Sequence, residues 1–208
     1  MVYVYCSINK IHISEVANIN FIKNYKSGSL LNRLETVDKQ EGQRYEVYDQ
    51  TLMNEDMGMY NSGTHQPTTL TLKEDNNATY IHQGQIVVNM MNGECVRITG
   101  KHSGMILPYN YTQIDLDNER IDPNYFVYWF NESPESLKQL KLFRQGGSLV
   151  KKITAKQLQE MKITLPPYEE QKIIGDIAEK RRKLKYLKQE REVLMDIYLK
   201  ETLLRGTI

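Results

Sequence analysis

Four histidines and one short polar pair are the residues whose types could support catalysis or bind a metal ion. The four histidines, His12, His65, His82 and His102, are scattered without the i, i+4 pairing that would place two of them on one helix face. Glu170 and Lys172 have the spacing of half a metal-nuclease motif, but no obvious aspartate partner accompanies them. We therefore expect no metal site, and no Ser/His/Asp or Cys/His catalytic set can be proposed from spacing.

The stretch Leu165-Pro166-Pro167-Tyr168 resembles part of a catalytic loop in enzymes that methylate an exocyclic base nitrogen. In that loop an Asn or Asp precedes the prolines and accepts hydrogen bonds from the target amino group, while the aromatic ring stacks on the flipped base. Leu165 has no hydrogen-bonding side-chain group. No strand is followed by the Gly-x-Gly-type turn and helix that would hold a methyl donor. We therefore expect a non-catalytic protein without a cofactor.

Polar and basic loop residues remain as candidates for DNA binding. Readers of DNA bases present Arg, Lys, Asn, Gln, Ser or His on loops, and further cations contact the phosphates. Loops 61–68 and 97–104 contain these types, and so does the region around Gly146-Gly147. The candidate residues are Arg97, Lys101, His102, Arg144, Lys151 and Lys152. The same residue types populate any solvent-exposed loop. On this observation alone, these loops either contact DNA or are ordinary surface loops.

The bulk properties indicate the class of protein. A chain of 208 residues suits one domain, or one domain with a sizeable appendage. Cys6 and Cys95 form no Cys-x-x-Cys pair, which argues against a disulfide framework or a thiolate zinc site. We expect a cytoplasmic protein, because no leader is recognisable and no stretch approaches the roughly 20 apolar residues that span a bilayer.

The net charge of +1 conceals an asymmetry between the two ends of the chain. Residues 1–150 carry 13 basic and 17 acidic side chains, whereas residues 151–208 carry 14 and 9. A basic segment can neutralise phosphate, but such charges are also typical of a solvated helix face.

Short apolar runs separated by turn residues predict strands between residues 13 and 116, because they are rich in Val, Ile, Thr and Tyr. The runs lie at residues 13–21, 43–50, 68–72, 78–82, 84–91, 94–100 and 111–116. Asn92-Gly93 predicts a tight hairpin turn between two of them. Most of residues 18–45 and 53–66 are expected to be loops.

Helices are predicted after Asp122. Residues 123–133 and 134–145 each begin with proline, which suits the first position of a helix, and Gly146-Gly147 should end the second. Thr154 and Gln157 have the spacing of a capping box, which predicts a short helix there.

A long helix is predicted at residues 169–204, which contain no proline and a single glycine. At about 1.5 Å per residue it would extend roughly 54 Å, more than the domain needs. An apolar seam with a/d-like spacing runs along it, formed by Ile177, Leu184, Leu187, Leu194 and Tyr198 and interrupted by Lys180, Arg191 and Glu201. The helix either lies on its own domain or projects and pairs with a second helix, and its length favours the second interpretation.

The order of these elements resembles the specificity subunit of Type I restriction-modification systems. "ISEVANINFIKNYKSG" is similar to the opening strand and loop of that family, and "IHQGQIVVNMMNGECVRITGKHSGMILPYNYTQI" to its central strands. "IDPNYFVYWFNES" and then "FRQGGSLVKKITAKQLQEMKITLPPYEEQKIIGDIAEKRRKL" resemble its helix, short helix, strand, Pro-Pro and long helix. The resemblance covers nearly the whole chain, and it is strongest from 121 to 184 and weak from 30 to 70.

The resemblance implies an α+β fold. A strand-rich target recognition domain with small helices would occupy residues 1–167, and a long spacer and dimerisation helix, residues 168–208, would pack in an antiparallel coiled coil. Members of the family typically carry two recognition domains and two long helices, whereas this chain has one of each. It would therefore be a half-length subunit whose homodimer directs a partner methyltransferase subunit, with or without a restriction subunit, to a bipartite sequence in double-stranded DNA.

A different function also fits the sequence. The chain would keep the fold and the helix but not read DNA, and it would act as an interaction module or decoy that binds a methyltransferase subunit. The acidic balance of residues 1–150 favours keeping this alternative, since a DNA-facing domain might be expected to be basic.

Overall fold

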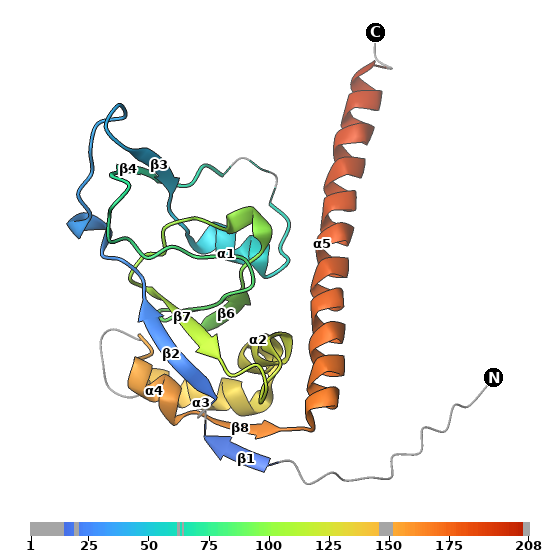
Figure 1. The fold of residues 1–208 in the computed structure, drawn as a ribbon. Coiled ribbons are helices and arrows are strands. Elements are labelled where there is room, and N and C mark those ends of the chain that lie inside the picture. The colour runs from blue at the N-terminus through green and yellow to red at the C-terminus, as the bar shows by residue number, and fades with distance from the viewer. Residues whose placement is uncertain (1–14, 19–20, 62, 64, 146–151, 206–208) are drawn as a thin grey trace, which may run out of the picture.

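The computed structural model describes residues 15–18, 21–61, 63, 65–145 and 152–205 (Figure 1). The strands are β1 (Glu15–Asn18), β2 (Ile22–Ser27), β3 (Gln43–Glu46), β4 (Thr69–Leu72), β5 (Ile86–Asn89), β6 (Glu94–Arg97), β7 (Tyr111–Leu116) and β8 (Lys162–Leu165). The helices are α1 (Gln50–Asp56), α2 (Pro123–Glu132), α3 (Pro134–Gln145), α4 (Ala155–Glu160) and α5 (Tyr168–Arg205), with single 3₁₀ turns η1 (Leu31–Arg33) and η2 (Gly100–His102).

A four-stranded antiparallel sheet with the order β2-β7-β5-β6 lies at the centre of the domain. Successive side chains of a strand point to opposite faces, so this sheet separates two cores. Val88 and Ile114 join the core that contains Trp129 of α2. Val87 belongs to the other core, with Met53 of α1. The expected α+β fold is confirmed by this arrangement.

The predicted hairpin between β5 and β6 is confirmed. Gly93 has a φ of 64°, in the left-handed region that favours glycine, and its N–H donates to the carbonyl of Asn89 at 2.9 Å. The helices predicted after Asp122 are also present. Thr154 and Gln157 form the expected reciprocal capping box at the start of α4, whereas Gly146-Gly147 lies outside the described residues.

Three predictions from the sequence were wrong. Strand β2 lies in a region expected to be loop, because it is an edge strand and its side chains are mostly exposed. Helix α1 was missed, because Asp49 ends an apparent strand pattern yet caps a helix with its carboxylate. The run at 78–82 forms a single bridge, between Tyr80 and Ile106, in place of a strand.

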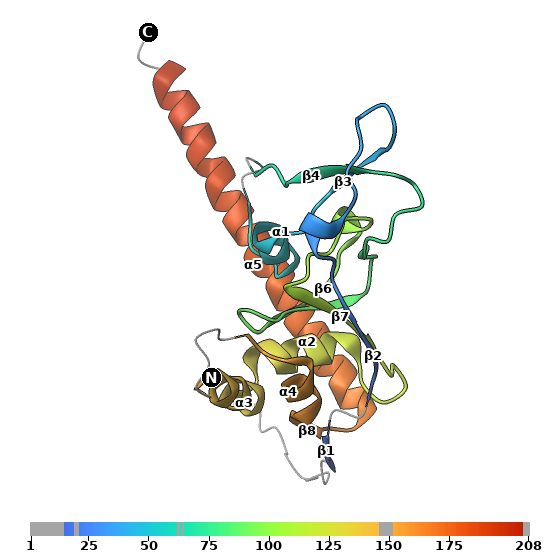
Figure 2. The ribbon, with the colours of Figure 1, turned by 90° about the vertical axis from the view of Figure 1, so that its left-hand side faces the viewer.

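The long helix α5 leaves the domain from strand β8, which pairs antiparallel with β1 (Figure 1). Pro166 and Pro167 separate β8 from α5, and Glu169 and Glu170 lie in the first helical turn, where carboxylates favour the positive end of the helix dipole. The first half of α5 packs against α2. Its C-terminal half runs away from the domain (Figure 2), and nearly all of its side chains from residue 191 onward are exposed.

Candidate nucleic-acid interface

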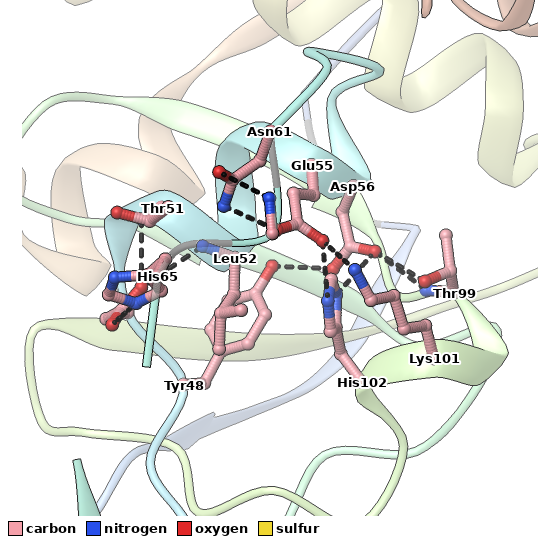
Figure 3. A network of polar contacts seen from close by, with 12 residues as sticks. Tyr48, Thr51, Leu52, Glu55, Asp56, Asn61, His65, Thr99, Lys101 and His102 are labelled. Atoms are coloured by element: carbon pink, nitrogen blue, oxygen red, sulfur yellow. Dashed lines mark hydrogen bonds and ion pairs between the residues drawn. The ribbon is translucent and has the colours of Figure 1, made fainter. Parts of the chain in front are cut away.

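A polar network connects the end of α1 to the loop that carries Lys101 (Figure 3). Asp56, the last residue of α1, has a fully buried side chain. Its carboxylate accepts hydrogen bonds from the hydroxyl of Tyr48 at 2.7 Å, from the N–H of Thr99 at 3.2 Å and from the hydroxyl of Thr99 at 2.7 Å. Asp56 therefore ties the loop that follows β6 to the second core.

His102 lies inside the protein, next to the same carboxylate (Figure 3). The side chain is 1% exposed, with Nδ1 3.0 Å from Asp56 Oδ1 and Nε2 3.4 Å from Glu55 Oε2. The prediction that His102 contacts DNA is not supported by this arrangement, because the ring faces the core and two carboxylates. We assign His102 to the support of the loop.

Lys101 is exposed on this loop, but its ammonium group forms an ion pair with Glu55. Burial raises the pKa of Glu55, yet hydrogen bonds from Lys101 and Asn61 outweigh that effect and leave the pKa below its ordinary value of 4.5. The hydrogen bond to Glu55 raises the pKa of Lys101. Part of the charge of Lys101 is therefore balanced within the protein.

We expect the contribution of Glu55 to stability to be lost in acid. Since its folded pKa is depressed, the contribution is present above the ordinary value of 4.5 and disappears as the pH falls through the folded pKa. Urea unfolding of the wild type and of Glu55→Gln should show the wild type to be more stable at pH 7 and the difference to shrink at pH 3. An unchanged difference between the two pH values would contradict this assignment. Glu74→Gln, at an exposed position, is the matched control.

Arg97 stands at the end of β6, beside a polar groove of about 510 Å³. Its guanidinium donates to the carbonyl of Gly84 at 3.4 Å and to the amide oxygen of Asn124 at 3.3 Å, both long hydrogen bonds. The other polar side chains along the groove come from β2, β7 and the loops beside them: Asn24, Lys26, Gln83, Gln85, Gln113, Asp115 and Asn118. Amide and guanidinium groups are the types that pair with base edges.

The remaining basic candidates are not gathered in the same place. Lys152 precedes Ile153, whose N–H donates to Met90, so Lys152 lies at the opposite end of β5 from Arg97. Its ammonium is 5.0 Å from the ring centre of Tyr109. The side chain of Arg144 and the whole of Lys151 lie outside the described residues. Of the predicted residues that the structure describes, Arg97, Lys101 and His102 share one stretch of chain, because Arg97 ends β6 and the other two lie in the turn η2 that follows.

The seam residues of α5 are all exposed, at 47% to 64% of their maximum. At about 100° per residue, they lie on the helix side opposite Gln171, Ala178 and Arg182, which face the domain. Further apolar side chains, Ile173, Met195, Ile197, Leu199, Leu203 and Leu204, are exposed on the same helix. An apolar face of this length on an unburied helix is typical of a surface that another helix covers.

Neither a metal centre nor a membrane span is found in the described ranges. No group of three or more His, Cys, Asp or Glu side chains there could hold a metal ion. Among the helices within these ranges, none combines the length and apolar character needed to cross a membrane.

Comparison with known proteins gives one family. Residues 8–194 match the family described as "Type I restriction modification DNA specificity domain". No curated protein matches the chain.

Several solved structures are similar to it, among them the two that follow. The HsdS subunit from Thermoanaerobacter tengcongensis is 15% identical, with a TM-score of 0.53 over 87% of this chain and 47% of that one. The S subunit of a Type I restriction-modification system from M. genitalium is 14% identical, with a TM-score of 0.49 over 83% and 40% of the two chains. The chain thus spans about half the length of these subunits.

Proposed function

We propose that this chain, which belongs to the family of Type I restriction-modification DNA specificity domains, reads one half of a bipartite DNA target as part of a homodimer. The observation that carries the proposal is the family match over residues 8–194. In this proposal residues 1–167 are the target recognition domain and residues 168–208 the spacer and dimerisation helix. The exposed seam of α5 supports pairing with a second chain, as a two-fold dimer on a bipartite target would require.

We place the DNA-reading surface at the polar groove. Arg97 and the amides of Asn24 and Gln83 supply donors and acceptors for base edges. Lys101 lies on the adjoining loop and would contact phosphate, exchanging its internal partner Glu55 for DNA. Lys152 remains a proposed phosphate contact on a separate part of the surface. Arg144 and Lys151 also remain proposed phosphate contacts.

The chemistry would belong to separate chains. A methyltransferase subunit would bind the methyl donor and flip the target base, and a restriction subunit, where the system has one, would cut the DNA. This chain would contribute binding and position alone.

Coexpression tests the proposal. The chain is produced with a methyltransferase subunit encoded beside it, and the modified bases of the host DNA are mapped by sequencing. We expect methylation at a bipartite palindromic motif, and loss of that methylation in Arg97→Ala. Methylation without any common motif would overturn the proposal.

The alternative, an interaction module or decoy, is favoured by the net acidic character of residues 1–150. It predicts tight binding of the methyltransferase subunit without a methylated motif. The same coexpressed complex, purified and then used for the methylation map, distinguishes the two functions.

A further inference from the structure

Helix α5 begins against the N-terminal end of α2, in a joint that leaves no room for a side chain at Gly175. A Cβ atom on Gly175 would lie 2.6 Å from Asp122 Oδ1, 2.7 Å from the backbone nitrogen of Tyr125 and 3.0 Å from the carbonyl carbon of Asn124. Asp122 caps α2 by accepting from the N–H of Tyr125 at 2.8 Å. These atoms belong to backbone and to a helix cap, so a methyl group at this position would have to push α5 away from α2.

Gln171, one helical turn earlier, fixes the same joint with hydrogen bonds. The side chain is 2% exposed. Its amide oxygen accepts from the N–H of Asp122 at 3.0 Å, and its amide nitrogen donates to the carbonyls of Pro166 at 3.0 Å and Arg120 at 3.3 Å. The start of α5, the end of β8 and the start of α2 are thus held by one amide.

A second contact supports the helix about three turns further on. The ring of Tyr60 lies edge-on to that of Tyr186 at 5.5 Å, and the N–H of Tyr60 donates to Gln189 at 3.1 Å. Eleven residues separate Gly175 from Tyr186, or about 16 Å along the helix. Between these two points Glu179 accepts a hydrogen bond from Asn124 of α2 at 2.9 Å, and Arg181 forms an ion pair with Glu132. The contact at Tyr186 lies beyond all of them, so a displacement at Gly175 tilts α5 about it.

The displacement of α5 that results from this tilt can be compared with the rise of one DNA base pair. If α5 pivots at the Tyr186 contact, a shift of about 1 Å at Gly175 moves Tyr198, which lies about 18 Å beyond the pivot, by roughly 1 Å in the opposite direction. In a two-fold dimer both joints change, so the two displacements add to about 2 Å, more than half of the roughly 3.4 Å rise of one base-pair step.

We propose that Gly175 and Gln171 are positioning residues that set the angle between the recognition domain and α5, and with it the number of base pairs between the two half-sites. This inference rests on the proposed function of a dimeric DNA reader. It separates two properties of the protein: the groove selects the half-site sequence, and the joint selects the spacing.

The test uses Gly175→Ala, with Asp176→Ala as the matched control on the exposed side of the same turn. If space were available, alanine would simply be a better helix former and the protein would become more stable. We expect the methylated motif from coexpression to keep its half-site sequences and change its spacing by a base pair or accept two spacings. An unchanged single spacing overturns the inference.

A second measurement follows the angle without methylation. Lys138 of α3 and Lys200 of α5 are both exposed, and Lys138→Cys with Lys200→Cys would carry spin labels in a Cys6→Ser background, in which Cys95 is buried. Pulsed electron paramagnetic resonance then measures the distance between the domain and α5. Gly175→Ala should shift this distance by about 1 Å, because the pivot at Tyr186 transmits the displacement to Lys200 almost one to one. Gln171→Ala adds no volume, so it keeps the test open if Gly175→Ala does not fold, and it should broaden the distribution. Distances in both variants equal to those of the wild type would overturn the assignment of Gly175 and Gln171 as positioning residues. Failure of the proposed function would show as a wild-type chain without a bipartite motif, whatever the distances.

Discussion

Changing Leu184 and Leu187 together to Asp should convert the proposed dimer into a monomer and leave the recognition domain folded. Both side chains are exposed on the face of α5 that points away from the domain, so the domain loses no packing. In a paired helix each leucine would contribute about 1.5–3 kcal/mol of burial, and a carboxylate in its place adds a desolvation cost. We expect association to weaken by at least about 4 kcal/mol, which is about 1000-fold in Kd.

Sedimentation equilibrium at micromolar concentration measures the association, and circular dichroism with urea unfolding measures the fold. Lys185→Asp with Lys200→Asp is the matched control, because it introduces the same two carboxylates on α5 outside the seam. A dimer that survives the leucine changes would show that the seam is misplaced. A wild-type chain that is monomeric under these conditions would count against the paired helix itself.

The long helix could be predicted because its signals are local. Proline is absent from residues 169–204, and the apolar spacing repeats along the same stretch. The capping box of α4 is local in the same sense, with its two partners three residues apart. Such features depend on neighbours in the sequence, and the fold then changes little about them.

The candidate interface was predictable only in part, because its parts come from distant segments. Arg97 and Lys101 were identified by charge and loop position. Asn24 lies along the same groove as Arg97 because β2 pairs with β7, and β2 itself was missed. His102 has the residue type of a surface loop, but Asp56, which lies 46 positions earlier in a helix that the sequence did not reveal, holds it in the core.

Removing the carboxylate of Asp56 is expected to cause the largest loss of stability. Burial and the neighbouring Asp56 carboxylate hold the pKa of Tyr48 far above its ordinary value of 10.0, so the Tyr48 hydroxyl stays protonated and donates a hydrogen bond to Asp56. In Asp56→Ala the buried hydroxyl and the buried ring of His102 lose their acidic partner, which should cost about 3–5 kcal/mol in the free energy of unfolding. That is a large share of the roughly 5–15 kcal/mol that stabilises a typical domain.

The same change should weaken DNA binding, because Thr99 loses both of its hydrogen bonds to Asp56 and the loop that carries Lys101 is released. Urea unfolding at pH 7 measures the stability, with the exposed Asp75→Ala as control. A double-mutant cycle assigns the loss to the pair: Tyr48→Phe should destabilise the wild type more than it destabilises Asp56→Ala, since the hydroxyl has no carboxylate to bind in the second background. Equal effects of Tyr48→Phe in both backgrounds would show that the hydrogen bond from Tyr48 to Asp56 adds nothing to the free energy of unfolding. In that case the stability lost in Asp56→Ala would come from the contacts of the carboxylate with Thr99 and His102.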